Sequence, residues 1–167
     1  LNCLSIDINE PDEDNNKFSF IKLDICEKEK LYEAVKNNDA LFHCVAQVPL
    51  AKNKKLFNKT NIEGTRSVLD ACLKSNIKKV VILSSSAVFG IPNENPVTDD
   101  TTPNPLEDYG KAKLVAEKIC FEKKYQNLNI SIIRPRTIMG DGRLGIFQIL
   151  FDWINEGQNI PVLDGGE

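Results

Sequence analysis

Several features that reveal function directly are scarce in this sequence, and each shortage excludes a class of protein. A single histidine, His43, and five widely spaced cysteines without a C-x-x-C pair argue against a zinc site. No apolar run is long enough to span a membrane, and no segment has the form of a signal peptide. The 21 basic and 24 acidic side chains are mixed along the chain, so no basic face suggests nucleic acid. We therefore expect a cytoplasmic protein with reduced cysteines that binds neither metal, membrane nor nucleic acid.

Apolar, strand-like runs alternate with segments of helical periodicity along the 167 residues. The expected strands cover residues 2–7, 18–24, 40–46, 79–85 and 129–135, and the expected helices cover 28–37, 60–76, 106–125 and 144–157. The strand over 79–85 is apolar almost throughout, which is typical of a sheet with both faces covered. This alternation predicts right-handed crossovers and therefore an α/β fold with a doubly wound parallel sheet. The long connection over 86–105 is rich in proline, asparagine, threonine and aspartate, and such loops are often functional.

Polar or small residues end the first three strands, at the edge where parallel sheets bind ligands. Asp7 can accept hydrogen bonds from the ribose hydroxyls of a dinucleotide and would repel a 2′-phosphate, which favours NAD over NADP. It can equally be a surface residue that starts a turn. Asp24 can contact an adenine, or it can form a capping box with Glu27. Val45 and Ala46 end the third strand, where small side chains admit a cofactor or simply pack tightly.

The spacing Tyr-x-x-x-Lys occurs twice, and on a helix it puts both side chains on one face. Tyr109 and Lys113 begin the helix after the long connection, and Ser85 ends the strand before that connection. An ammonium and a nicotinamide cation nearby would favour the phenolate of a tyrosine, whose pKa is ordinarily about 10. The phenolate can then take a proton from a substrate alcohol that Ser85 orients. Tyr32 and Lys36 lie within a helix that no serine-ended strand precedes, so we interpret them as packing or surface residues.

Several motifs resemble those of the extended short-chain dehydrogenase/reductase family, and they occur in the family's order. They are LDI (23–25), FHCVA (42–46), NIEGT (61–65), SSSAVFG (84–90), YGKAK (109–113) and IRPRTIMG (133–140). The similarity is greatest to the branch of NAD-dependent epimerases and dehydratases that act on nucleotide sugars. It implies an incomplete Rossmann-like fold and an enzyme of that branch. It also implies that Tyr109 is the general acid/base, Lys113 its partner and Ser85 the catalytic serine.

The same resemblance assigns contacts with NAD and with the substrate. The cofactor residues would be Asp7, Asp24, Ile25, Val45, Ala46, Asn61, Tyr109, Lys113 and Pro135, and the substrate residues Ser85 and Thr137. A partial nucleotide-binding domain is expected over 1–143 and the start of a substrate-binding region over 144–167. No G-x-x-G-x-x-G occurs, so the pyrophosphate loop is expected to lie outside these residues. In this family the helix over 106–125 often joins a partner helix in a homodimer, although its apolar stripe can equally be core.

Two other functions are compatible with these motifs. A net oxidoreductase of the same family, such as a hydroxysteroid or sterol dehydrogenase, would share all of them. A non-catalytic family member, serving as a scaffold or regulatory binder, would be consistent with the absent glycine motif.

Overall fold

The structure, a computed structural model, describes residues 2–11, 18–47, 56–140 and 146–160. The chain forms two compact units, Leu1–Arg134 and Pro135–Glu167, and each is described by itself. The first contains β1 (Leu4–Asp7), β2 (Ser19–Lys22), α1 (Lys28–Val35), β3 (Ala40–His43), η1 (Phe57–Glu63), α2 (Gly64–Lys74), β4 (Lys79–Leu83), η2 (Ser86–Phe89), α3 (Asp108–Cys120), η3 (Lys123–Tyr125) and β5 (Asn129–Ile133). The second contains α4 (Ile146–Asn155). Every strand and helix expected from the sequence is present, and the strands are shorter than expected.

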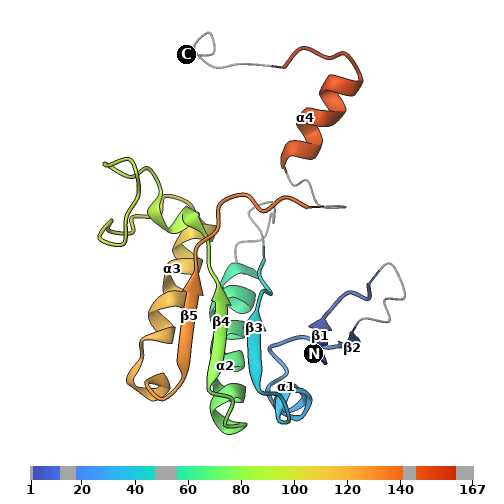
Figure 1. Cartoon of the computed structure of the whole chain (residues 1–167), viewed down its shortest axis with the longest axis vertical. Coiled ribbons are helices and arrows are strands. Elements are labelled where there is room, and N and C mark those ends of the chain that lie inside the picture. Colours follow the sequence, from blue (N-terminus) through green and yellow to red (C-terminus); the bar gives the residue numbers. More distant parts are fainter. Residues whose placement is uncertain (1, 12–17, 48–55, 141–145, 161–167) are drawn as a thin grey trace. The chain divides into compact units, whose positions relative to one another are not determined.

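All strand pairs in the first unit are parallel. β1 pairs with β2, and β3, β4 and β5 form a second sheet with β4 in the centre. In this sheet Val80 lies opposite Leu41 on one side and Ile130 on the other. Helices follow β2, β3 and β4 before the next strand begins (Figure 1). The parallel α/β architecture predicted from the sequence is therefore confirmed.

The core lies between the three-stranded sheet and the helices on one of its faces. Val80 and Ile82 of β4 are buried in the same apolar cluster as Leu69 of α2 and Ile119 of α3. Because side chains alternate across a strand, their neighbours point to the opposite face. There Phe42 is 71% exposed and Ile133 is 49% exposed. Within the described part of the first unit, helices cover only one face, so the covering of both faces expected from the apolar 79–85 run is not found (Figure 1).

The buried stripe of α3 differs from the apolar stripe expected in the sequence. Ile119 and Cys120 are buried as expected, but Val115 is 39% exposed. Lys113 and Glu117 are instead buried, and they are 7% and 2% exposed. Two charged side chains therefore face the interior on successive turns of α3, which requires polar partners for both.

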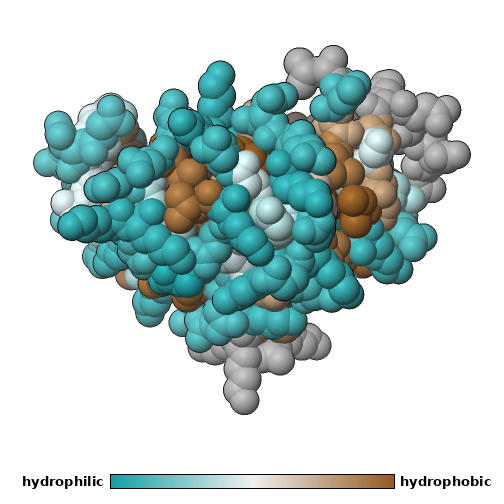
Figure 2. Space-filling model, turned by 90° about the horizontal axis from the view of Figure 1, so that it is seen from below, coloured by the Kyte–Doolittle hydropathy of each residue, from teal (hydrophilic) through white to brown (hydrophobic). Residues whose placement is uncertain are grey.

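The second unit contains α4, an apolar helix whose side chains at Ile149, Phe151 and Ile154 are largely exposed. The division of the chain after Arg134 precedes the predicted domain boundary after residue 143. The assignment of the two parts to cofactor and substrate remains a prediction. None of the described helices combines the length and apolarity that crossing a bilayer requires. Hydrophilic side chains cover most of the face seen in Figure 2.

Candidate active site

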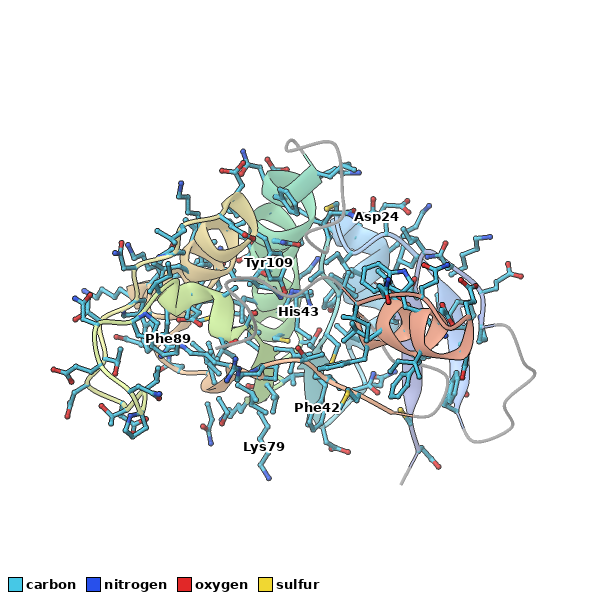
Figure 3. All side chains as sticks on the ribbon, turned by 90° about the horizontal axis from the view of Figure 1, so that it is seen from above. Asp24, Phe42, His43, Lys79, Phe89 and Tyr109 are labelled. Carbon is cyan, nitrogen blue, oxygen red and sulfur yellow. The ribbon has the colours of Figure 1, made fainter. Side chains whose placement is uncertain are left out.

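The carboxyl ends of β3, β4 and β5 meet at one edge of the sheet, because the three strands are parallel. Figure 3 looks along the strands from above. Tyr109 and His43 lie on the helix side of the sheet in this view, whereas Phe42 lies on the other side. The predicted catalytic residues come from the segment after β4 and from the first turns of α3.

Ser85 lies two residues beyond the end of β4, where the chain turns into η2. Its backbone is extended, and its Oγ accepts a hydrogen bond from the N–H of Ala87 at 3.2 Å. A serine at this position satisfies an N–H group that the first turn of a helix leaves without an intrahelical partner. Ser85 also acts on the phenol of Tyr109, whose pKa it lowers as a hydrogen-bonding partner. The structure therefore brings together the serine and the tyrosine predicted to share a substrate oxygen.

Tyr109 is placed by a close approach between α3 and η2 at the next residue, Gly110. A Cβ on Gly110 would lie 2.5 Å from the carbonyl oxygen of Ala87 and 3.0 Å from Cβ of Pro105. Only glycine allows the two backbones this separation. Phe57 packs edge-on against the Tyr109 ring, with centroids 6.3 Å apart. Burial raises the pKa of Tyr109, and the hydrogen bond from Ser85 acts in the opposite direction.

Lys113 lies one helical turn beyond Tyr109 and points to the end of β4. Its Nζ donates a hydrogen bond to the carbonyl oxygen of Leu83 at 2.7 Å and lies 6.0 Å from the centroid of the Tyr109 ring. Burial lowers the pKa of Lys113 to about 8, although Cys44 and Glu117 favour its charged form. The ammonium form therefore predominates at neutral pH. Lys113 can present a positive charge beside the phenol, as the sequence predicts.

His43, which the sequence analysis considered only as a metal ligand, is buried at the end of β3 near Lys113. Its Nε2 lies 3.0 Å from Oγ1 of Thr65, and that hydroxyl donates its proton to the carbonyl oxygen of Asn61 at 2.8 Å. Nε2 must therefore carry the proton that it shares with Thr65. Burial and the charge of Lys113 lower the pKa of His43 to about 4. A neutral His43 adds no second charge beside Lys113. The alternation of side chains along a strand carries no signal for this role.

Asn61 is buried in η1 and fixes the loop after β3. Its Oδ1 accepts a hydrogen bond from the N–H of Gln47 at 2.7 Å, and its Nδ2 donates to the Gln47 carbonyl oxygen at 3.1 Å. The predicted cofactor residues Val45 and Ala46 are half-buried in this loop. Asn61 thus shapes the segment predicted to line the cofactor by holding its backbone.

Asp7 ends β1 and is exposed, and its Oδ1 accepts a hydrogen bond from the N–H of Asn9 at 2.9 Å. This is a turn-initiating contact, and it leaves the carboxylate at the edge where a ribose would bind. Both interpretations of Asp7 are therefore compatible with the structure.

Asp24 is held in place by two contacts at the end of the β2 segment. Its carboxylate accepts a hydrogen bond from the Cys26 N–H at 2.9 Å and forms an ion pair with Lys59 at 3.0 Å. These two contacts, the Cys26 bond first, lower the pKa of Asp24. The capping-box alternative is wrong, because Glu27 is the N-cap of α1 and no side chain caps that helix. Ile25 is buried in the core, so only its backbone is placed to meet a cofactor.

Pro135 and Thr137 follow β5 and belong to the second unit. Their predicted contacts with the cofactor and the substrate remain predictions. The competing pair on α1 has surface contacts. Lys74 lies 3.9 Å above the ring of Tyr32, and Lys36 forms an ion pair with Glu33.

Tyr109 and Lys113 offer a phenol and an ammonium beyond the end of β4, and Asp7 offers an exposed carboxylate at the end of β1, in the other sheet. Within the described ranges, no group of histidine, cysteine and acidic side chains could hold a metal ion.

Comparison with known proteins identifies one family and several relatives. Residues 5–167 match the model of the NAD dependent epimerase/dehydratase family. Uncharacterized protein y4nG of Sinorhizobium fredii is 48% identical over 96% of this chain and 41% of its own length. The mouse decarboxylating sterol-4-alpha-carboxylate 3-dehydrogenase is 28% identical over 92% of this chain and 44% of its own. The chain thus spans less than half the length of these relatives.

Among solved structures, UDP-glucuronic acid 4-epimerase from Bacillus cereus in complex with NAD superposes with a TM-score of 0.78. It is 26% identical, and the match covers 95% of this chain and 56% of that one. The Rossmann-like fold and the family predicted from the motifs are both confirmed.

Proposed function

Because the chain belongs to the NAD-dependent epimerase/dehydratase family, we propose that it forms the catalytic part of an enzyme that epimerises or dehydrates a nucleotide sugar. The observation that carries the proposal is the position of the Tyr109 phenol, whose pKa Ser85 lowers and whose ring centroid lies 6.0 Å from the buried ammonium of Lys113. The similarity to a UDP-glucuronic acid 4-epimerase supports a nucleotide sugar as the substrate.

The residues proposed to hold NAD are those that the motifs indicate. They are Asp7, Asp24, Ile25, Val45, Ala46, Asn61, Tyr109, Lys113 and Pro135. When bound there, NAD supplies a hydride acceptor that can later return the hydride to the substrate. The Asp7 carboxylate would repel a 2′-phosphate, so NAD is preferred to NADP.

Tyr109 is the proposed general acid/base, and its protonation state is set by opposing effects. Burial raises its pKa, which favours the phenol, whereas hydrogen bonding by Ser85 lowers it. A positive charge on Lys113, 6.0 Å from the ring centroid, would also favour the phenolate. As phenolate, Tyr109 takes the proton of the sugar hydroxyl that is being oxidised, while Ser85 donates a hydrogen bond to the same oxygen. The phenol returns that proton when the carbonyl is reduced again. The proton is conserved over the cycle, as an epimerase without net redox change requires.

A second candidate is a net dehydrogenase that acts on a sterol or steroid alcohol. The 28% identity to the mouse sterol dehydrogenase over 92% of this chain supports it. The same Tyr109 chemistry would apply, but NADH would leave the enzyme instead of reducing the intermediate. Accumulation of NADH with a sterol substrate, and none with a UDP-sugar, would favour this candidate.

The test uses the full-length polypeptide with NAD and two UDP-sugars, UDP-glucose and UDP-glucuronic acid, with products identified by NMR. Tyr109→Phe should lower turnover by about 100-fold or more, because it removes the acid/base group, while calorimetry shows NAD still bound. Tyr32→Phe is the matched control, since it has the same Tyr-x-x-x-Lys spacing on α1. Undiminished turnover in Tyr109→Phe would refute the assignment.

A further inference from the structure

Glu117 is a buried carboxylate that the proposed mechanism does not use. It lies on α3 one turn beyond Lys113 and two turns beyond Tyr109, and it is 2% exposed. It accepts a hydrogen bond from the Ser84 hydroxyl at 2.5 Å. It also accepts two from Arg134, at 2.9 Å from Nε and 2.7 Å from Nη2. The carboxylate is therefore held by three donors from two other segments.

These donors come from the ends of two neighbouring strands. Ser84 directly precedes Ser85 after β4, and Arg134 is the residue that follows β5. The Arg134 guanidinium also lies 5.1 Å from the centroid of the Phe89 ring, and Phe89 belongs to η2, which begins directly after Ser85. Through one carboxylate, α3 is thus connected to the chain on both sides of Ser85.

Such a buried ion pair is a poor way to gain stability. The loss of hydration on burying a carboxylate can exceed the attraction of its partner, so apolar side chains of similar size often stabilise a protein equally well. The chain contains a second bidentate pair, between Arg66 and Glu122, whose side chains are about 40% exposed. Of these two pairs, the one formed by Glu117 is also hydrogen-bonded to Ser84, the residue next to Ser85. Bidentate pairing fixes the geometry of the two side chains as well as neutralising their charges.

The charge of Glu117 also acts on Lys113. The titratable groups that act on Lys113 are Tyr109 and Glu117 on α3, and His43 and Cys44 at the end of β3. Glu117 favours the ammonium form, whereas burial opposes it. His43 is neutral at physiological pH and does not compensate the charge of Lys113. The carboxylate of Glu117, one turn along α3, favours the ammonium and so partly offsets the cost of burying it.

We propose that Glu117 is a positioning residue of the active site, which holds α3 against the ends of β4 and β5 so that Tyr109 meets Ser85. Its carboxylate also sustains the charge on Lys113. Glu117 contacts neither substrate nor cofactor in this role, and it acts through Ser84 and Arg134. The proposal rests on the function proposed above and adds to it a residue that sets the geometry and the pH range of the site.

The test compares Glu117→Gln with Glu122→Gln, the matched control, in the full-length polypeptide with NAD and the UDP-sugar that is turned over. Glu117→Gln keeps the size of the side chain and an acceptor oxygen but loses the charge. We expect its kcat to fall by about tenfold or more with little change in KM, because misplacement affects mainly the chemical step. The alkaline limb of its kcat profile should move to lower pH, since a neutral amide no longer favours the ammonium. Glu122→Gln should keep both the rate and the profile.

A second readout needs no turnover. The ¹³Cε resonance of Lys113, assigned with Lys113→Met, is titrated in lysine-labelled protein without cofactor. In Glu117→Gln the Lys113 pKa should lie below its wild-type value. If Glu117→Gln does not fold, Ser84→Ala carries the test, because it removes the link to β4 and keeps the charge. It should lower kcat without moving the Lys113 titration.

The outcomes separate this proposal from the function on which it rests. In Glu117→Gln, an unchanged Lys113 titration with a loss of kcat that is equal at every pH would show a merely structural Glu117 and overturn the proposal. Wild-type kcat in Glu117→Gln, or in Ser84→Ala where that variant carries the test, would do the same. An active Tyr109→Phe enzyme would instead refute the proposed function, whatever the Lys113 titration shows.

Discussion

Gly110→Ala is the substitution for which the structure makes the sharpest prediction. The new methyl group would lie 2.5 Å from the Ala87 carbonyl oxygen, 3.0 Å from Cβ of Pro105 and 3.1 Å from the Ala87 carbonyl carbon. These are backbone and proline-ring atoms, which cannot rotate away as the end of a flexible side chain can. The first turn of α3 must therefore move away from η2, and Tyr109, the preceding residue, must move with it.

The effects on stability and on catalysis should differ in size. Overpacking of this kind costs about 1–3 kcal/mol, whereas alanine in place of glycine inside a helix returns about 1 kcal/mol. The free energy of unfolding should thus fall by no more than about 2 kcal/mol. Turnover should fall by about 100-fold, because a displacement of about 1 Å at a reacting group can cost that much. A large loss of rate with a small loss of stability is the expected result.

The assay pairs urea denaturation with turnover of the UDP-sugar in the full-length polypeptide. Gly64→Ala in α2 is the control, because its new methyl group would lie 2.6 Å from Cδ1 of Ile25, the movable end of a side chain. Gly64→Ala should keep its turnover. Gly110→Ala with wild-type turnover and stability would show that the approach of α3 to η2 does not place Tyr109, and it would refute this account of the site.

Two further predictions concern buried polar groups. Asn61→Ala removes both hydrogen-bond partners of the Gln47 backbone and should lower the free energy of unfolding by about 1–3 kcal/mol. It should also weaken NAD binding measured by calorimetry. Unchanged affinity would argue against the role of Asn61 in shaping the loop. Because the pKa of Lys113 falls from 10.5 to about 8 on folding, the unfolded chain binds more protons between these values, so this residue makes stability rise with pH across that window. The free energy of unfolding of Lys113→Met should exceed that of wild type near pH 7 by up to about 3 kcal/mol. This difference in stability should shrink toward pH 10.5. A difference that stays constant with pH would contradict the burial of a charged Lys113.

The elements of the fold could be predicted because their signals are local. β4 is apolar from Val80 to Leu83 and α2 has apolar residues at helical spacing, and both occur where the sequence places them. The coverage of the sheet could not be predicted from the same signal. An apolar strand indicates that its side chains avoid water, but it does not indicate which segment covers each face of the sheet. On the face opposite the helices, Phe42 is largely exposed among the described residues.

The motifs name the residues of the candidate site but not the contacts among them. Ser85, Tyr109 and Lys113 follow from the motifs, and their catalytic roles stay predictions; the structure places Ser85 where it acts on the Tyr109 phenol. Helical periodicity assigns charged residues to the solvent side, which hides the burial of Lys113 and Glu117. Their polar partners, Leu83 for Lys113 and Ser84 for Glu117, are 30 and 33 residues away in the sequence. Contacts of this separation leave no periodic signal.

The two Tyr-x-x-x-Lys pairs show why spacing alone does not make a catalytic site. Lys36 is paired with the exposed carboxylate of Glu33, which raises the pKa of the lysine, and Tyr32 adds to this shift. Lys113 is buried against the end of β4, where burial lowers its pKa to about 8. The two lysines therefore differ in burial and in the direction of their pKa shifts, although each follows a tyrosine by four residues. The chemistry proposed for Tyr109 and Lys113 thus depends on the approach of α3 to the strand ends, which Gly110 permits and Glu117 is proposed to maintain.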